Sequence, residues 1–258
     1  MQPVNISCVS YINSAPFVHG LKHHTVSRKI NLSLDNPAEC AARLQSGDAD
    51  IGLIPVAAIA SVTNAKRISD WCIGAVGPVK SVTLLSEVPV EKIKHIYLDF
   101  QSVTSNLLCK ILAKKFWNIN PVYLKASPGF EQFITGTTAG VVIGDRSLRL
   151  QNQYKYVYDL SAAWYELTSL PFVFATWISN KPLEAAFVKD FNDALSFGIA
   201  SMHEVINDLK SSHGYHEGTE DYLLKSLSYN FDDAKNRGME LFLDYASEVK
   251  TTSFSDPL

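Results

Sequence analysis

Apolar and polar residues alternate in short runs, separated by helix-like segments, over about the first 180 residues. Apolar residues alternate with polar neighbours over 3–9, which predicts a strand, and 30–34 shows the same alternation. Asn36 followed by Pro37 is typical of a helix start, and Gly47 suits the end of that helix. This rhythm predicts mostly parallel sheets that are covered by helices.

The same reasoning extends along the rest of the chain. Further strands are expected at 50–54, 81–86, 95–98, 122–124, 140–143 and 172–177. Helices are expected at 56–60, 102–117, 131–134, 159–167, 183–209, 222–227 and 232–249. Because a second α/β series begins after Pro89, the pattern predicts an α/β protein with two lobes, each built on its own sheet.

The lobes are expected to share the chain unequally. Lobe 1 comprises 1–84 plus 177–258 and lobe 2 comprises 87–174, with crossover strands that form a hinge near 84–86 and 174–176. Ligands of open parallel sheets bind beyond the carboxyl ends of the strands. We therefore expect the strand-to-helix loops of both lobes to line one cleft.

The charge, cysteine and histidine content of the chain argues against nucleic acid, metal and cofactor binding. The chain has 23 Lys and Arg against 26 Asp and Glu, a net charge of −3 and no basic block, so nucleic acid is not expected to bind. The four cysteines are spaced without a C-x-x-C pair, and no histidine lies at metal-ligand spacing. We therefore expect small buried thiols, no metal site and no cofactor.

Two further patterns concern location. No apolar stretch reaches the ~18 residues of a membrane span. Residues 1–6 lack a basic segment followed by an apolar run. We therefore expect no membrane contact and a cytoplasmic protein.

The loops expected in the cleft carry mainly hydroxyl, amide and backbone N–H groups. Such donors and helix N-termini bind anions, so a small dicarboxylate can be held without arginine. Lys80 and Arg146 adjoin these loops as cations that can attract an anion from a distance. No G-x-S-x-G, P-loop or G-x-G-x-x-G pattern occurs. The candidate binding residues are Ser10, Tyr11, Pro55, Val56, Val79, Ser102, Thr104, Ser105, Gly144 and Asp145.

Several candidates also have a purely structural interpretation. Ser102, Thr104 and Ser105 suit the capped start of a helix as well as they suit ligand binding. Asp145 fits either a helix cap or a group that orients a substrate hydroxyl. Asn13 fits either a turn or an amide that faces the substrate.

Several motifs follow one another in a distinctive order. They are Val9-Ser-Tyr-Ile-Asn-Ser-Ala-Pro16, Asn36-Pro-Ala-Glu-Cys40, Leu44-Gln-Ser-Gly-Asp-Ala-Asp-Ile-Gly-Leu-Ile-Pro55, Gly77-Pro-Val-Lys-Ser-Val82, Ser102-Val-Thr-Ser105, Val142-Ile-Gly-Asp145, Asp159-Leu-Ser-Ala-Ala-Trp164 and Leu170-Pro-Phe-Val-Phe-Ala-Thr-Trp177. Together they resemble the menaquinone-biosynthesis chorismate dehydratases of the futalosine route. The resemblance covers residues 5–180.

The resemblance implies a bilobed type II periplasmic-binding-protein-like fold, in agreement with the two lobes expected above. It also implies a carbon–oxygen lyase that converts chorismate to 3-[(1-carboxyvinyl)oxy]benzoate and water, with Asn13 and Ser81 as functional residues. Asp145 is the one carboxylate in the matched loops that are expected to line the cleft. The base is therefore expected to be either a carboxylate of the bound substrate or Asp145.

Other functions use the same fold. A non-catalytic small-anion binding protein would normally carry a signal peptide or lipid anchor, which the sequence does not show. A 1,4-dihydroxy-6-naphthoate synthase-like enzyme would have a Ser-Pro-Cys-Pro-Asn-Asp type of first loop. The effector domain of a transcription regulator would carry a helix-turn-helix extension.

Overall fold

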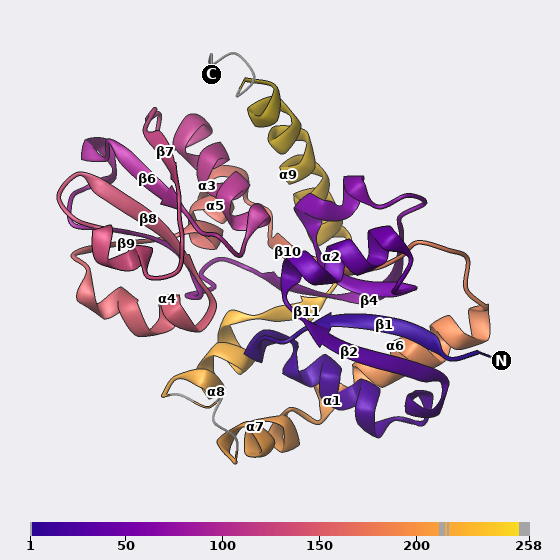
Figure 1. The fold of residues 1–258 in the computed structure, drawn as a ribbon. Coiled ribbons are helices and arrows are strands. Elements are labelled where there is room, and N and C mark those ends of the chain that lie inside the picture. Colours follow the sequence, from indigo (N-terminus) through magenta and orange to yellow (C-terminus); the bar gives the residue numbers. More distant parts are fainter. Residues whose placement is uncertain (1, 212–214, 216, 253–258) are drawn as a thin grey trace. The chain divides into compact units, whose positions relative to one another are not determined.

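The computed structural model describes residues 2–211, 215 and 217–252, and for 250–252 the backbone alone. Its contacts divide the chain into two units (Figure 1). Unit 1 comprises Met1–Gly74 and Val173–Asp232, and unit 2 comprises Ala75–Phe172 and Asp233–Leu258. The chain therefore passes from one unit to the other three times.

The elements alternate between strands and helices, as expected. Unit 1 holds, to within one residue at its boundaries, β1 Val4–Val9, α1 Ala15–His23, β2 Ile30–Asp35, α2 Pro37–Ser46, β3 Ile51–Pro55, β4 Lys66–Ala75, β10 Phe172–Ser179, α6 Ala185–Ala200, α7 Met202–Lys210, α8 Thr219–Asp221 and β11 Ser228–Asn230. Unit 2 holds β5 Val82–Ser86, β6 His95–Leu98, α3 Val103–Lys115, β7 Val122–Lys125, β8 Thr138–Ile143, α4 Gly144–Leu150, β9 Tyr156–Asp159, α5 Leu160–Thr168 and α9 Asp233–Thr252.

Each unit has one mixed sheet. The six strands of unit 1 run in the order β11-β4-β10-β3-β1-β2, with β1 parallel to β2 and β3, and β10 antiparallel to β3. The five strands of unit 2 run β7-β6-β8-β5-β9, with β6 parallel to β7 and β8, and β5 antiparallel to β8 and β9. The predicted α/β class with two sheets is thus confirmed, although the sheets are mixed, whereas the alternation of strands and helices predicted mostly parallel ones.

The division between the units differs from the expected lobes. β5 was expected at the end of lobe 1, but it pairs with β8 and β9 of unit 2. The last helix was expected in lobe 1, but α9 contacts α3, and its Phe242 packs edge-on against Trp164 and Phe172, all in unit 2. Pairing and aromatic packing therefore place the first crossing near residue 75 and add a third near residue 232.

Several elements differ from those expected from the pattern. Strands β4, β9 and β11 and helix α1 were not predicted. The helices expected over 56–60 and 131–134 are the 3-10 helices Val56–Ser61 and Phe130–Phe133, and the one expected over 222–227 is the π-helix Tyr222–Ser226. The expected helix over 183–209 is two helices, α6 and α7, because the backbone of Ser201 leaves the helical region, with φ −87° and ψ 27°.

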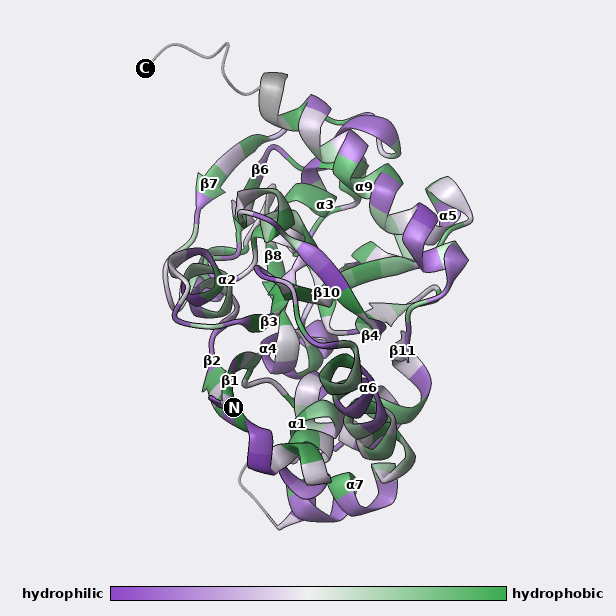
Figure 2. Ribbon diagram, turned by 90° about the vertical axis from the view of Figure 1, so that its right-hand side faces the viewer, coloured by the Kyte–Doolittle hydropathy of each residue, from purple (hydrophilic) through white to green (hydrophobic). Residues whose placement is uncertain are grey.

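Aromatic side chains form much of each core. In unit 1, the Trp177 ring contacts those of Phe17 and Phe191 edge-on. Strands β3 and β10 are coloured mainly as hydrophobic (Figure 2), in keeping with the buried side chains that they carry. The four cysteines are buried thiols that form no disulfide bond, which confirms the expectation of small buried thiols.

Helices α1 and α6 approach each other closely because both carry glycine at the contact. A Cβ added at Gly20 would overlap the carbonyl oxygen of Ala194, and one added at Gly198 would overlap that of Pro16. Helix α1 follows directly after the loop that contains Asn13, so the contact between α1 and α6 positions the end of that loop.

Candidate active site

The loop after β1 carries Ser10, Tyr11 and Asn13. The Ser10 N–H donates to the Asp35 carbonyl oxygen at 3.0 Å, so the loop starts against the end of β2. Asn13 lies in the 3-10 turn Ile12–Ser14, and the buried hydroxyl of Ser14 donates to the carbonyl oxygens of Val9 (2.5 Å) and Tyr11 (2.7 Å). These bonds hold the turn from inside.

The Asn13 side chain stands out in this loop. The residue is half-buried, and its Oδ1 is buried without a hydrogen-bond partner among the residues that the structure describes. A buried acceptor without a partner is costly and needs an explanation. The structure therefore does not give Asn13 the hydrogen bond through Oδ1 that a turn-forming role would use.

Asp35 supports the same loop and was not among the predicted residues. Its Oδ2 accepts hydrogen bonds from the hydroxyls of Ser7 and Ser33, both at 2.6 Å, and lies 3.7 Å from Nε of Arg43. Burial alone would raise the pKa of Asp35, but the bonds from Ser33 and Ser7 and the charge of Arg43 outweigh it, so the pKa is lowered. Because Asp35 therefore stays ionised near neutral pH, it is a firm anchor for the end of β2.

Pro55 ends β3, which lies beside β1, and Val56 follows it. The two strands are parallel, with Ile6 opposite Ile51, so the loops that follow them emerge at the same edge of the sheet. Pro55 is half-buried and Val56 is fully buried. The structure thus brings the unit 1 candidates to one edge.

The unit 2 candidates also gather at one edge of their sheet. Ser81 precedes β5, and Val82 lies opposite Ile143 at the end of the antiparallel strand β8. Because β6 and β8 are parallel, the start of α3 emerges at that same edge. Ser81, Ser102, Thr104, Ser105, Gly144 and Asp145 therefore lie at the end of the sheet where β6 and β8 finish.

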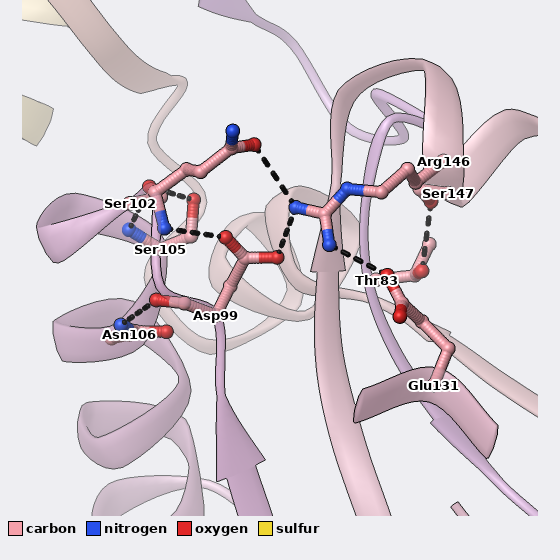
Figure 3. A network of polar contacts seen from close by, with 9 residues as sticks. Thr83, Asp99, Ser102, Ser105, Asn106, Glu131, Arg146 and Ser147 are labelled. Carbon is pink, nitrogen blue, oxygen red and sulfur yellow. Dashed lines mark hydrogen bonds and ion pairs between the residues drawn. The ribbon is translucent and has the colours of Figure 1, made fainter. Parts of the chain in front are cut away.

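The start of α3 is capped by its own hydroxyls. Oγ of Ser102 accepts from the Ser105 N–H at 3.1 Å, and the two hydroxyls lie 2.8 Å apart (Figure 3). Thr104 and Ser105 are each 2% exposed. The structural interpretation of Ser102 is thus confirmed, while the binding role of all three residues stays a prediction.

Arg146 is the centre of a polar network in unit 2 (Figure 3). Its guanidinium donates to Asp99 at 2.6 Å, to Glu131 at 2.6 Å and to Gln101 at 3.1 Å, and it lies 5.0 Å above the Phe100 ring. Two carboxylates therefore offset its single charge. This overturns the expectation that Arg146 attracts anions from a distance.

The network also fixes the segment that leads into α3. Asp99 has a fully buried side chain, and its Oδ1 accepts from the Gln101 N–H at 2.8 Å. Burial raises the pKa of Asp99, whereas the Gln101 N–H and Arg146 oppose that rise. The Asn106 amide donates to the Asp99 carbonyl oxygen at 2.7 Å, so both ends of this turn are held.

The loop before β5 is held by Asp159, a residue that sequence reasoning assigned only to a helix start. Asp159 Oδ2 accepts from the backbone N–H groups of Val79 at 2.9 Å and Lys80 at 2.6 Å. Val79 is buried, and the exposed Lys80 has a left-handed backbone with φ +66°. Ser81 follows directly and is 3% exposed.

Asp145 lies at the start of α4, and both of its interpretations, as a helix cap and as a group that orients a substrate hydroxyl, stay predictions. It lies in the first turn of α4, whose N-cap residue, Ile143, makes no side-chain cap bond. Asp145 is half-buried at the edge of the sheet where Ser81 lies. Its role as a base stays a prediction.

The described residues hold neither a cluster of metal ligands nor a membrane-spanning helix. No group of three or more His, Cys, Asp or Glu side chains among them is placed to hold a metal ion. None of the helices in that part of the chain is both long and apolar enough to cross a membrane.

Comparison with known proteins identifies the family. A family model described as menaquinone biosynthesis matches residues 4–248. The chain belongs to this family. Among its relatives, it is 24% identical over 264 residues to the chorismate dehydratase of Thermus thermophilus, with 95% of each chain covered. It is 27% identical over 188 residues to the chorismate dehydratase of Campylobacter jejuni, with 71% of each chain covered.

A solved structure extends the comparison to the fold. The periplasmic aliphatic sulphonate binding protein of Escherichia coli superimposes with a TM-score of 0.65 at 16% sequence identity, covering 100% of this chain and 94% of that one. At this identity the likeness concerns the fold alone. It confirms the periplasmic-binding-protein-like fold that the family resemblance implied.

Proposed function

We propose that this member of the menaquinone biosynthesis family is a chorismate dehydratase of the futalosine route. In this proposal it is a carbon–oxygen lyase that removes water from chorismate to give 3-[(1-carboxyvinyl)oxy]benzoate. Family membership and the two relatives with that name support the proposal. The observation that carries it is the buried Oδ1 of Asn13, which has no hydrogen-bond partner among the described residues and lies just beyond the carboxyl end of β1.

The reaction needs few chemical groups from the protein. The ring loses a hydroxyl group and the proton of a neighbouring ring carbon. The electron pair of that C–H bond becomes part of the new ring π system while the C–O bond breaks. The base that takes the proton passes it to the departing hydroxide, which leaves as water. Because the ring becomes aromatic, the substrate supplies the driving force, and the enzyme has to hold it and organise the proton transfer.

Asn13 and Ser81 are the residues to which we assign this organisation. The Asn13 carboxamide offers an oxygen that can accept a hydrogen bond from a substrate hydroxyl and an NH₂ group that can donate to a carboxylate. The Ser81 hydroxyl polarises charge that develops in the transition state. The proposed binding set is completed by the hydroxyl groups of Ser10, Tyr11, Ser102, Thr104 and Ser105, by the N–H groups of Val56 and Asp145, and by Pro55, Val79 and Gly144 as van der Waals contacts.

The direct test is to incubate the purified chain with chorismate and to follow the product by mass spectrometry. A product lighter than chorismate by one water, with the ultraviolet absorption of a substituted benzoate, supports the proposal. Chorismate that stays unchanged, or a product of another mass, would overturn it. Binding without turnover would instead support the non-catalytic anion-binding protein, whose fold the sulphonate-binding structure shares.

A second experiment separates the two candidate bases. Asn13→Ala and Asp145→Ala are compared in single-turnover reactions. If a substrate carboxylate takes the proton, N13A lowers the rate by about 10²-fold or more, because the substrate is held less well, while D145A stays close to wild type. A collapse confined to D145A would identify Asp145 as the base. We further propose a cytoplasmic location, which fits an enzyme of this pathway.

A further inference from the structure

Asp159 connects two segments that are far apart in the sequence. It ends β9 and lies opposite Thr83 of β5 in the sheet. Its Oδ2 accepts hydrogen bonds from the backbone N–H groups of Val79 (2.9 Å) and Lys80 (2.6 Å). Its Oδ1 accepts from the N–H groups of Ser161 and Ala162, both at 3.0 Å, and so caps α5. One carboxylate therefore receives four backbone donors.

The loop that Asp159 holds has a disfavoured conformation. Lys80 has φ +66°, a region that residues other than glycine rarely adopt. Such backbone conformations persist only where the surroundings over-determine them, and they concentrate at functional sites. Here the two N–H donors to Asp159 restrain Lys80 from one side.

The opposite side of the same loop is held by α4. The hydroxyl of Ser147 donates to the Lys80 carbonyl oxygen at 3.0 Å, and the Gly144 N–H donates to the Ser81 carbonyl oxygen at 2.7 Å. Ser147 in turn lies 2.8 Å from the hydroxyl of Thr83 (Figure 3). The backbone on both sides of the Ser81 Cα is thus fixed by groups from β9 and α4.

We propose that Asp159 is a positioning residue for Ser81. Its carboxylate keeps Lys80 in the left-handed conformation, and this directs the Ser81 hydroxyl to the place where it acts on the substrate. The inference rests on the proposed function of Ser81. It adds a residue that touches no substrate and acts through the backbone of the loop before β5.

The test uses Asp159→Asn. Asparagine is as good an N-cap as aspartate, so its side-chain oxygen keeps the cap of α5. Its NH₂ group then faces the N–H groups of Val79 and Lys80, and because all of these groups are donors, the two hydrogen bonds to the loop are lost. With chorismate as substrate, we expect kcat to fall by about 10²-fold, as for a misplaced reacting group, with KM changed less than threefold. Asp159→Ser, which also caps helices but is too short to reach the loop, is the second variant.

Glu87→Gln is the matched control. Glu87 belongs to the same unit, and its Oε2 accepts from the backbone N–H of Gly136 at 2.6 Å, at the other end of β5. The substitution thus makes the same carboxylate-to-amide change against a distant backbone donor, away from Ser81. We expect kcat and KM of E87Q to stay within about twofold of wild type. A loss of kcat in E87Q equal to that in D159N would show that Asp159 has only a general structural role, and it would overturn the proposal.

Rescue by a change at Lys80 tests the mechanism itself. Glycine adopts positive φ at little cost, so K80G should restore the loop conformation when the restraint from Asp159 is gone. The double variant D159N/K80G is expected to recover about tenfold in kcat over D159N, the factor that corresponds to the cost of a left-handed L residue. No recovery would contradict a role through Lys80.

Amide hydrogen exchange supplies a readout that does not need the reaction. The Val79 and Lys80 amides should exchange at least ten times faster in D159N than in wild type and at the wild-type rate in E87Q. If wild type leaves chorismate unchanged, the proposed function fails, and the exchange rates still decide whether Asp159 holds the loop. Unchanged exchange at both amides in D159N and D159S, or an unchanged kcat in an active protein, would overturn the inference.

Discussion

Lys80 combines an exposed side chain with a left-handed backbone, and both features determine how a substitution at this residue changes stability. The exposed side chain leaves substitutions at this position free of packing effects. The positive φ costs about 1–2 kcal/mol for a residue with a Cβ. Hydrogen bonds from the loop backbone to Asp159 and from Ser147 to the loop offset that cost.

Lys80→Gly should therefore stabilise the protein. The gain from relieving the left-handed residue exceeds the extra entropy of glycine in the unfolded chain, and the free energy of unfolding is expected to rise by about 0.5–1 kcal/mol. Urea denaturation at equilibrium measures it. The same substitution at the exposed Lys189, inside α6, should lower the free energy of unfolding by about 1 kcal/mol. Two changes of the same sign would contradict this interpretation.

The sequence predicted those candidate site residues that lie in loops after strands. Residues that follow strands, such as Asn13 and Ser102, were found because a loop after a parallel strand faces the ligand side of a sheet. Asp35, Asp99 and Asp159 were missed as organising groups, because their partners lie 28, 47, and 79 or 80 residues away in the chain. A carboxylate's role depends on these partners, and no local pattern specifies them.

Helices α1 and α6 illustrate a constraint at the scale of elements. Their close approach requires glycine on both helices, since a Cβ at Gly20 or Gly198 would overlap a backbone carbonyl of the other helix. A backbone atom cannot rotate away as a side chain can. The pair must therefore separate if either glycine gains a methyl group, and α1 would move together with the adjoining Asn13 turn.

Gly198→Ala should lower the free energy of unfolding by about 1–3 kcal/mol, the usual cost of overpacking, even though alanine is the better helix former. Thermal and urea denaturation measure this loss. Ser196→Ala is the control, because Ser196 is exposed on the same helix, and it should leave stability unchanged or slightly raise it. A neutral G198A would show that the helices separate without cost.

The sequence pattern failed to predict strands that depend more on pairing with other strands than on the β preference of their own residues. Strand β4 begins with Lys66 and Arg67 and has no clean alternation, and β11 has three residues. Both are stabilised by pairing with distant strands: β4 lies between β10 and β11 in the sheet, and about 150 residues separate β4 from β11. Strands β1, β2 and β3 were predicted because their apolar residues are dense and the turn residues around them are distinct.

At the scale of the whole molecule, α9 decides which segments fold together. Its amphipathic pattern predicts a helix that packs on something, but it does not specify the partner. In the structure, Phe242 contacts the rings of Trp164 and Phe172, and Glu248 pairs with Lys115 of α3 at 2.7 Å. The C-terminal segment thus completes the core of unit 2.

Phe242→Ala should therefore destabilise unit 2. Removing a fully buried phenylalanine costs about 3–5 kcal/mol. Hydrogen exchange followed by mass spectrometry locates the effect: faster exchange is expected in β5, β6 and β8. Phe191→Ala, at a fully buried ring of unit 1, should instead act on β1 and β3. Faster exchange of β1 and β3 in F242A would assign α9 to the other unit.

The order in which the strands are synthesised differs from their order in the sheet of unit 1. Strand β10 lies between β3 and β4 in the sheet, yet it is translated after the whole of β5 to β9. While the ribosome extends the chain through unit 2, the edges of β3 and β4 lack their central neighbour and stay open to pairing with other nascent chains. A message truncated before Phe172 would thus yield a product prone to aggregate, and chaperones that bind emerging chains should matter most during that interval.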